Sequence, residues 1–282
     1  MTSELAAYIA DQGLPDAYAS FAAEVLTPLA GRIVGAERRG AYVVGITGSQ
    51  GSGKSAAAGA LAVLLRGEGL RVATLSIDDL YLTQAERQRL AAEVHPLLIT
   101  RGVPGTHDVG FGEAVLASLA SARGTSVPRF DKARDERRET PDLVEGPVDV
   151  ILFEGWCVGA RPQRRVALIR PINLLEEVED PDGVWRTYAN NQLAGPYQRL
   201  FARIDLQVML RDPGFEVVLG WRREQEAKLR AKGAGGQTDA ELARFVQFYE
   251  RLTRHIDAEM PARAHVVVNL DHDRQLKIAP SP

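Results

Sequence analysis

The chain has 282 residues, of which 45% are hydrophobic and 25% charged, proportions typical of a globular protein rather than a disordered or fibrous one. Asp and Glu total 37 and Lys and Arg total 34, so the net charge is -3 with His neutral. Because there is no basic excess to neutralise a phosphate backbone, we expect no nucleic-acid partner.

Cysteine usage and hydropathy predict where the protein works. The single cysteine, Cys157, cannot form an internal disulfide, and residues 1–10 lack the basic and then apolar pattern of a secretory signal. The longest apolar stretches, such as residues 148–153, are far shorter than the roughly 20 residues that span a bilayer. The sequence therefore predicts a cytoplasmic protein with no membrane partner.

The first 40 residues are expected to form a helical N-terminal extension. Apolar residues such as Leu5, Tyr8 and Ile9 recur at helical spacing, with interruptions near Gly13 and Pro28. We expect residues 41–282 to form the main domain, on which this extension packs.

Five short apolar runs rich in β-branched residues predict buried strands, at residues 42–47, 71–77, 148–153, 205–210 and 265–269. Helical or loop sequence long enough for a crossover separates each run from the next. This alternation predicts an α/β fold with a parallel five-stranded sheet and helices on both faces.

Two segments are expected to lie around the carboxyl edge of this sheet, where open α/β sheets bind ligands. Residues 81–147 contain many prolines and predict an irregular insertion. Residues 215–240 predict a lid, made of one helix that ends at Gly233, a turn at 233–236 that acts as a hinge, and a second helix that opens with a capping box at Thr238.

A phosphate-binding motif follows the first predicted strand directly. The residues Gly48, Ser49, Gln50, Gly51, Ser52, Gly53, Lys54 and Ser55 match G-x-x-x-x-G-K-[ST] and open a predicted helix. We expect the backbone N–H groups and the helix N-terminus to bind phosphates, Lys54 to contact the β- and γ-phosphates, and the Ser55 hydroxyl to ligate Mg²⁺. The alternative, a Gly/Ser-rich turn that merely links strand to helix, requires the Lys-Ser pair and both flanks to be coincidental.

Nucleotide binding alone fits a kinase, an ATPase or a GTP-driven switch. A guanine-specific protein is expected to carry Asn-Lys-x-Asp late in the chain, and the sequence has none. Asp180 to Gly183 matches D-x-x-G, but no apolar strand precedes it. The switch is therefore disfavoured.

Carboxylates follow two of the predicted strands. Asp78 and Asp79 come after the second strand, where a kinase needs a base for the acceptor hydroxyl, although either residue could instead cap a helix. Glu154 ends the strand at 148–153, the place of an acid that serves Mg²⁺ in other P-loop proteins. A buried structural carboxylate paired with an arginine is the alternative for Glu154.

Together these segments resemble the P-loop small-molecule kinases that include uridine kinase, phosphoribulokinase and pantothenate kinase, and most closely the D-glycerate 3-kinase family. The matching segments are residues 45–55, 75–83, 101–108, 128–132, 152–156 and 221–226. The resemblance covers the chain from about residue 40 to its end and implies a P-loop kinase fold that uses ATP and Mg²⁺. It also implies that the acceptor is a small metabolite, with D-glycerate first among the candidates.

The resemblance also implies roles for individual residues. Asp78 is then the catalytic base, with Asp79 secondary, and Glu154 with Ser55 serves Mg²⁺. Arg222 and Arg223 then belong to the lid and act catalytically with Lys54. The segment after Lys132 departs from the family pattern, which has a longer glycine-containing stretch ending in Asp-Arg.

A group of polar residues is assigned to the acceptor side of the site. Besides Asp79 it comprises Tyr81, Arg101, His107, Asp108, Arg129 and Lys132. The cations among them, with Arg137, favour an anionic acceptor, the alternative being scattered surface charges. A pantothenate, nucleoside or sugar acceptor, or an NTP-hydrolysing switch or chaperone, stays open, and the sequence specifies neither the oligomeric state nor the adenine-contacting residues.

Overall fold

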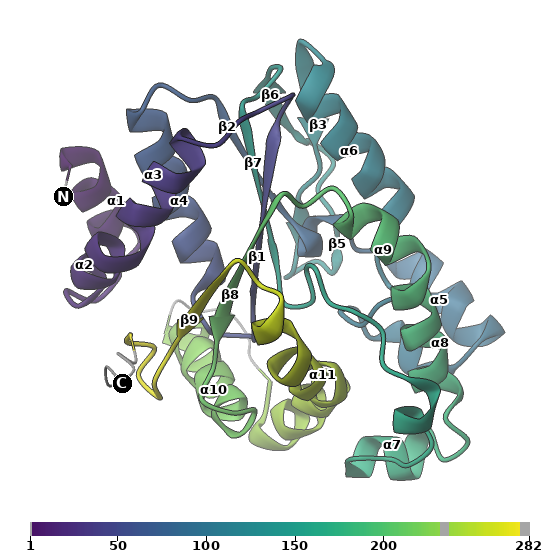
Figure 1. The fold of residues 1–282 in the computed structure, drawn as a ribbon. Helices are drawn as coiled ribbons and strands as arrows, with labels where there is room; N and C mark the ends of the chain where they lie inside the picture. The colour runs from purple at the N-terminus through teal and green to yellow at the C-terminus, as the bar shows by residue number, and fades with distance from the viewer. Residues whose placement is uncertain (1, 232–236, 277–282) are drawn as a thin grey trace.

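The computed structural model describes residues 2–231 and 237–276. Its centre is a five-stranded sheet in the order β2-β7-β1-β8-β9 (Figure 1), in which every neighbouring pair is parallel. The predicted fold class is confirmed, and each predicted strand is present, as β1 (Tyr42–Gly48), β2 (Val72–Ser76), β7 (Val150–Gly155), β8 (Leu206–Arg211) and β9 (Val266–Asn269).

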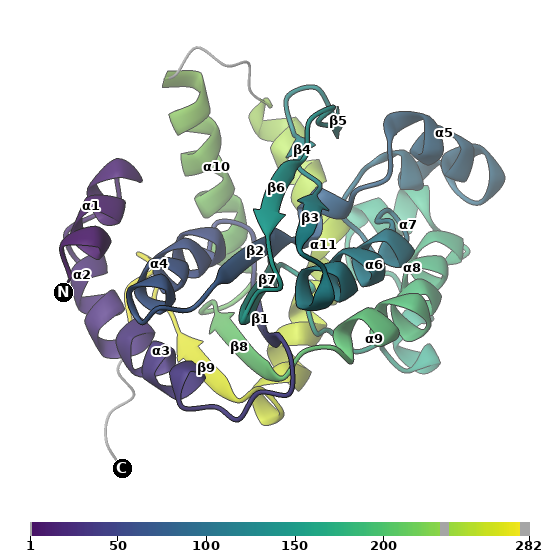
Figure 2. The same cartoon turned by 90° about the horizontal axis from the view of Figure 1, so that it is seen from above.

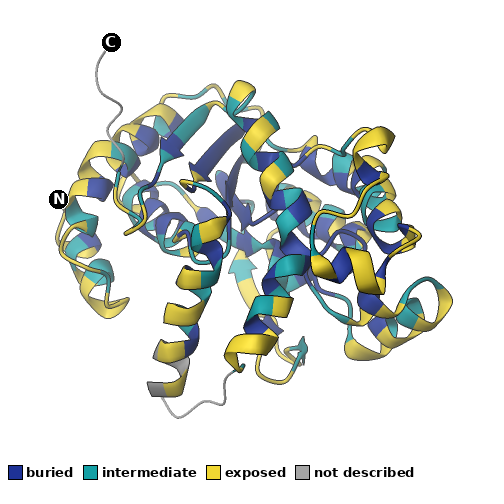
Figure 3. Cartoon of the chain, turned by 90° about the horizontal axis from the view of Figure 1, so that it is seen from below, coloured by how far each residue is buried: buried dark blue, intermediate teal, exposed yellow. Residues whose placement is uncertain are grey.

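Helices cover both faces of the sheet because successive strand residues point to opposite sides. Val150 and Leu152 belong to a core shared with α3 (Thr27–Val34) and α4 (Lys54–Gly67). The intervening Ile151 belongs to a core on the opposite face. Figure 2 shows these two layers on either side of the strands, and Figure 3 shows that the strands are buried between them.

The N-terminal residues are helical, as predicted. They form α1 (Ser3–Asp11), α2 (Tyr18–Phe21) and one π-helical segment at residues 22–26 before α3. Leu5 and Phe21 are buried against α4 residues in a third core. The Tyr8 hydroxyl donates to the Ala56 carbonyl at 3.2 Å, so this segment is bonded directly to the helix that follows the phosphate-binding motif.

The segment at 81–147 is more regular than predicted. It contains α5 (Gln84–Glu93) and α6 (Val109–Ser121), and two short antiparallel ladders that pair β3 (Gly124–Val127) with β6 (Asp142–Glu145) and β4 (Phe130–Asp131) with β5 (Glu136–Arg137). The expectation of an irregular insertion is wrong for these elements, because the prolines lie outside both helices. Apolar residues of α6 share the sheet's core.

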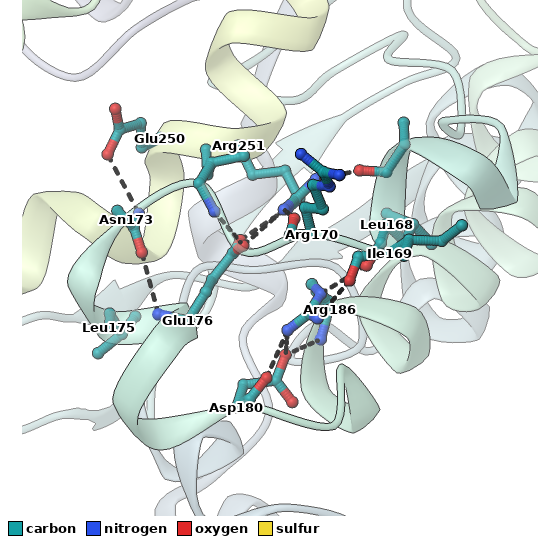
Figure 4. Close-up of polar contacts among 12 residues, drawn as sticks. Leu168, Ile169, Arg170, Asn173, Leu175, Glu176, Asp180, Arg186, Glu250 and Arg251 are labelled. Atoms are coloured by element: carbon teal, nitrogen blue, oxygen red, sulfur yellow. Dashed lines mark hydrogen bonds and ion pairs between the residues drawn. The ribbon is translucent and has the colours of Figure 1, made fainter.

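Helices α7 (Leu174–Glu179), α8 (Val184–Ala194) and α9 (Pro196–Phe201) follow β7. Two ion pairs hold this region together: Arg186 meets Asp180 at 2.9 Å, and Arg251 meets Glu176 at 2.6 Å (Figure 4). All four side chains are buried, and both arginines also donate to backbone carbonyls. The Arg251 pair joins α7 to α11 (Asp239–Glu259).

The predicted lid helices are present. They are α10 (Glu216–Ala231) and α11, and α11 begins with the predicted Thr238–Glu241 capping box. The hinge predicted at residues 233–236 lies outside the described residues.

Along the described part of the chain, no helix combines the length and the apolar character needed to cross a membrane. Cys157 is a fully buried free cysteine, and burial raises the pKa of its thiol.

The buried ion pair of Arg251 gives a stability prediction. Replacing Glu176 with Ala leaves the guanidinium buried without its carboxylate, so we expect the free energy of unfolding to fall by about 3 to 5 kcal/mol. The control is Glu179→Ala on the same helix, because its partner Arg244 is half exposed and such pairs contribute about 1 kcal/mol or less. Chemical denaturation measures both, and equal small losses would contradict the prediction.

Candidate active site

The phosphate-binding motif forms the tight loop that its glycines predict. Gly51 and Gly53 have φ angles of +82° and +88°, a conformation that side chains other than glycine strain to adopt. Helix α4 then begins at Lys54. The Ser49 and Ser52 hydroxyls are buried and lack a hydrogen-bond partner among the described residues. An anion bound at this helix N-terminus would accept hydrogen bonds from these hydroxyls.

Glu154 lies beside this loop at the end of β7. Its Oε1 accepts a 2.9 Å hydrogen bond from the Ser55 hydroxyl, while its buried Oε2 has no partner in the part of the chain that the structure describes. Burial raises the pKa of this carboxyl, and the nearby Lys54 opposes the shift. Since Mg²⁺ in kinase sites takes one or two protein oxygens together with phosphates and water, Ser55 and Glu154 fit a bound Mg²⁺.

Asp78 lies across from Glu154, in a 3-10 turn (Ile77–Leu80) that follows β2. Its two carboxylate oxygens accept from Lys132 Nζ at 2.6 Å and from the Tyr81 hydroxyl at 2.7 Å. Burial favours the neutral acid, but Lys132 and Lys54 outweigh it and hold the pKa of Asp78 well below its usual range. The carboxylate is therefore ionised at neutral pH, the state that a proton acceptor needs.

Asp79 and Arg129, both predicted to bind the acceptor, are paired with each other. Asp79 accepts from Arg129 Nη1 at 2.8 Å, and from the backbone N–H groups of Phe130 and Ser76. The Arg129 guanidinium also meets Asp142 at 2.7 Å. Both charged groups are thus occupied in joining the turn after β2 to the β3–β6 ladder, and Asp79 also completes the capping box of that turn, whose N-cap residue is Ser76.

His107 and Tyr81 come together, with their rings stacked at 4.7 Å between centroids. The buried His107 Nδ1 lies 2.6 Å from the Tyr197 hydroxyl, which accepts from the Gly105 N–H. Burial lowers the pKa of His107 to about 4. The expectation that His107 adds positive charge is therefore wrong at neutral pH, and the imidazole is a neutral polar group.

Arg101 and Lys132 lie at the same side of Asp78. The Arg101 guanidinium lies 5.4 Å from the Phe130 ring centroid and forms an ion pair with Asp135, to which the buried Arg87 also binds. Arg101 Nη2 donates to the Lys132 carbonyl at 3.3 Å. The segment that departs from the family pattern thus carries a carboxylate that anchors two arginines.

Asp108, predicted to lie on the acceptor side, makes contacts that support the local fold. It caps α6 by accepting from the Phe111 N–H at 3.0 Å, and it pairs with Arg137 at 3.3 Å. Arg137 in turn donates to the Tyr81 carbonyl. These contacts support the loop that carries Tyr81, and an N-cap aspartate is an ordinary helix signal.

The two predicted lid arginines point to different partners. Arg222 contacts Gln225 and Glu226, lies 5.5 Å from the Phe245 ring centroid and has a buried Nε without a partner in the described chain. Arg223 is half exposed and pairs with Asp239 at 3.5 Å. This pair with Asp239 does not place Arg223 at the phosphate-binding loop.

Two tyrosines of this region were not predicted. Tyr197 comes from α9, and Tyr249 comes from α11 and donates to the Arg101 carbonyl at 3.0 Å. Both lie on helices that follow β7, far along the chain from the 101–108 loop. Tyr249 belongs to a clear apolar face in the sequence, so its spacing signals a core position.

Comparison with known proteins gives relatives that are named as kinases. The chain is 35% identical over 220 residues to the uncharacterized kinase mug58 of Schizosaccharomyces pombe, covering 74% of this chain and 78% of that protein. It is 33% identical over 222 residues to the chloroplastic D-glycerate 3-kinase of Arabidopsis thaliana, covering 73% of this chain but only 46% of that protein.

A solved structure of D-glycerate 3-kinase from Cryptococcus neoformans matches with a TM-score of 0.73 and 26% identity, covering 91% of this chain and 99% of that one. A family profile described as methylmalonyl Co-A mutase-associated GTPase MeaB matches residues 18–81. That match runs from α2 to the turn after β2, so it does not cover Glu154, α10 or α11.

The parallel sheet and the phosphate-binding loop after β1, together with these relatives, define a P-loop kinase. The chain belongs to the family of P-loop small-molecule kinases that includes D-glycerate 3-kinase.

The positions of Asp79 and Arg129 give a second prediction. Arg129→Ala removes the ion-pair partner of a largely buried carboxylate, so we expect the free energy of unfolding to fall by roughly 1 to 3 kcal/mol. The control is Arg134→Ala, because that side chain is 80% exposed and its nearest carboxylate lies 3.9 Å away. Thermal denaturation compares them, and an Arg129→Ala variant as stable as the control would show that the pair is dispensable.

Proposed function

We propose that this kinase transfers the γ-phosphoryl group of ATP to a hydroxyl of D-glycerate. The observation that carries the proposal is the Asp78 carboxylate, held ionised beside Lys132 and Lys54 at the edge of the sheet next to the phosphate-binding loop. Two relatives bear the name D-glycerate 3-kinase. Since the match spans less than half of the Arabidopsis protein, its substrate is extended to this chain as part of the proposal.

The phosphate side is assigned to the loop and its two neighbours. The backbone of residues 48–55 and the Lys54 ammonium hold the β- and γ-phosphates, whose charge they offset. Ser55 and Glu154 would hold Mg²⁺, which would supply positive charge to offset that of the phosphates. Arg222 on α10 is the lid residue that we retain as a phosphate ligand, on the strength of its unpartnered Nε.

Asp78 is assigned the role of base. The acceptor oxygen forms a bond to the γ-phosphorus, the bond from that phosphorus to the bridging oxygen of ADP breaks, and the hydroxyl proton passes to the Asp78 carboxylate. The Tyr81 hydroxyl holds one carboxylate oxygen at 2.7 Å. This bond fixes the orientation of the carboxylate. Its orientation matters because phosphoryl transfer depends mainly on positioning and charge.

The acceptor carboxylate is assigned to the cations around Asp78. Among the residues that the structure describes, Lys132 pairs with Asp78, while Arg101 and Arg87 share the Asp135 carboxylate, and this surplus of cations over carboxylates in the ion pairs supports an anionic ligand. The Lys132 side chain is 63% exposed and therefore accessible to it. A neutral acceptor would leave this charge without a partner, which favours a hydroxy acid over a sugar or a nucleoside.

The role of Asp78 is tested by Asp78→Asn. The amide fills the same space but cannot take the proton, so we expect MgATP binding to persist while phosphoryl transfer falls by roughly two to four orders of magnitude. Calorimetry measures binding and ADP release measures transfer. Asp79→Asn is the matched control, expected to lower stability and keep transfer, and an inactive Asp79→Asn beside an active Asp78→Asn would reverse the assignment.

The acceptor is tested by comparing D-glycerate with glycerol, which has the same carbon skeleton and no carboxylate. We expect kcat/KM for glycerol to be lower by on the order of 10⁴, because the site's charged groups lose their partner. Lys132→Ala should raise the KM for glycerate, while Arg134→Ala, which removes an exposed cation two residues away, should not.

Efficient phosphorylation of a nucleoside, a sugar or pantothenate, with none of glycerate, would move the chain to another branch of the family. ADP release that needs no acceptor would instead favour the NTP-hydrolysing switch.

A further inference from the structure

Exposed apolar side chains are gathered in one stretch of the chain, from a 3-10 turn (Arg165–Leu168) to the first residue of α8. Six of the eight large apolar side chains that are exposed in the described part of the chain belong to it: Val166, Ile169, Ile172, Leu174, Val178 and Val184. We call these six side chains the apolar patch. Single apolar residues at a surface are ordinary, whereas a gathered group marks an interaction site.

The buried Arg251 ties the 165–168 turn to α7 (Figure 4). It pairs with Glu176 of α7 at 2.6 Å, and it donates to the Ala167 and Arg170 carbonyls, both at 2.6 Å. The Ile172 N–H donates to the other side of this centre, the Glu176 Oε2, at 3.1 Å. The turn, the residues that follow it and α7 are thus joined around one ion pair.

The buried Arg186 makes a second link of the same kind (Figure 4). It pairs with Asp180 at the end of α7 at 2.9 Å, and it donates to the Leu168 and Ile169 carbonyls at 2.7 and 3.3 Å. Asp180 also accepts from backbone N–H groups in the first turn of α8, which begins at Val184. The three segments that carry the apolar patch are therefore fixed next to one another.

On each segment the patch residues share a side that faces solvent. Leu174 and Val178 lie four residues apart on α7, a spacing that places them on one face, and they are 65% and 66% exposed. The neighbouring Leu175 is buried in the core. Val166 and Ile169 lie three residues apart along the 3-10 turn, a spacing that stacks side chains on one side.

The two ion pairs order this surface before any partner binds. A buried ion pair costs much of its own attraction in desolvation, so it is weak evidence for added stability. Here the two arginines together hold every backbone carbonyl from residue 167 to residue 170. A partner that binds the apolar patch would therefore lose little affinity to the ordering of the backbone.

The charges beside the apolar patch are divided by sign, and this division indicates which partner fits. An arginine group, Arg164, Arg165 and Arg170, is exposed at the turn, and an acidic group, Glu177 and Asp182, is exposed on and after α7. A partner of one sign would be repelled by one of the two groups. A second copy related by a two-fold axis brings the opposite sign to both, because in such an interface residue i meets residue j and j meets i.

The size of this surface also fits a second copy. Sixteen of the 24 residues from 164 to 187 are exposed. This number approaches the roughly 20 to 30 residues that each side of a stable interface contributes. Its apolar centre and charged margin match the usual anatomy of interfaces.

We propose that the apolar patch joins two copies of this chain in a symmetric dimer, in which the arginine group of each copy faces the acidic group of the other. The proposal stands apart from the proposed function, because none of the patch residues belongs to the active site.

The first test exchanges charges between the copies. The acidic variant carries Arg164→Glu, Arg165→Glu and Arg170→Glu, and the basic variant carries Glu177→Arg and Asp182→Arg. Each variant alone sets like charges against each other, so we expect each to have the mass of a single chain. Mixed in equal amounts, the two variants bring opposite charges together at both ends, and we expect the mass of two chains. Size-exclusion chromatography with light scattering over a dilution series measures these masses, and a variant that failed to fold would not be rescued by mixing.

The second test removes apolar surface. Leu174→Ser combined with Val178→Ser should raise the Kd of the dimer by about tenfold or more, because two apolar side chains no longer leave water on association. Leu143→Ser is the matched control, since that leucine is 74% exposed on β6 and lies outside the apolar patch. It should leave the Kd unchanged.

An unchanged chain that has the mass of one chain at every concentration would overturn the proposal. So would a mixture of the acidic and basic variants that stays monomeric, or a dimer that the Leu174 and Val178 changes do not weaken, since either result would place the contact elsewhere. An unchanged chain that stays monomeric and sediments with phosphatidylserine vesicles would assign the apolar patch to a membrane surface instead.

Discussion

The position of β7 between β1 and β2 is the constraint on which the site depends. The parallel register sets Glu154 opposite Ile46 on one side and Ser76 on the other. Because parallel strands end at a common edge, the phosphate-binding loop, the turn that carries Asp78 and the Glu154 carboxylate meet there although they are far apart in the chain. A shift of β7 by one residue would turn Glu154 to the other side of the sheet.

The two acids at this edge differ in their surroundings, and this difference separates their proposed roles. Asp78 has a hydrogen bond to each oxygen and two lysines nearby, so it stays charged. Glu154 is more deeply buried and has one oxygen without a partner, and burial raises its pKa. A cation bound beside Glu154 would offset the cost of burying its negative charge, whereas Asp78 already has Lys132 and Lys54 beside it. Metal binding thus suits Glu154, and proton acceptance suits Asp78.

The sequence predicted the sheet well, because each strand is a short apolar run and the motif Gly48 to Ser55 marks where the first strand ends. It predicted the surroundings of the site less well. The sequence around Arg129 and Asp108 shows that these residues are charged. It does not show that Arg129 pairs with Asp142 and Asp108 with Arg137, each on another segment. Tyr197 was missed for a related reason, since its contact with His107 joins residues 90 positions apart. Local patterns carry no information about such pairs.

The burial of Cys157 has a practical consequence for spectroscopy. Thiol reagents attack the thiolate, and a fully buried thiol whose pKa is raised offers neither access nor that ionised form. A fluorophore or spin label directed at a cysteine introduced on the surface would therefore attach at one site, with the native cysteine left in place. Placed on the exposed face of α10, such a label would report changes in the local surroundings of the helix that carries Arg222 as nucleotide and acceptor bind.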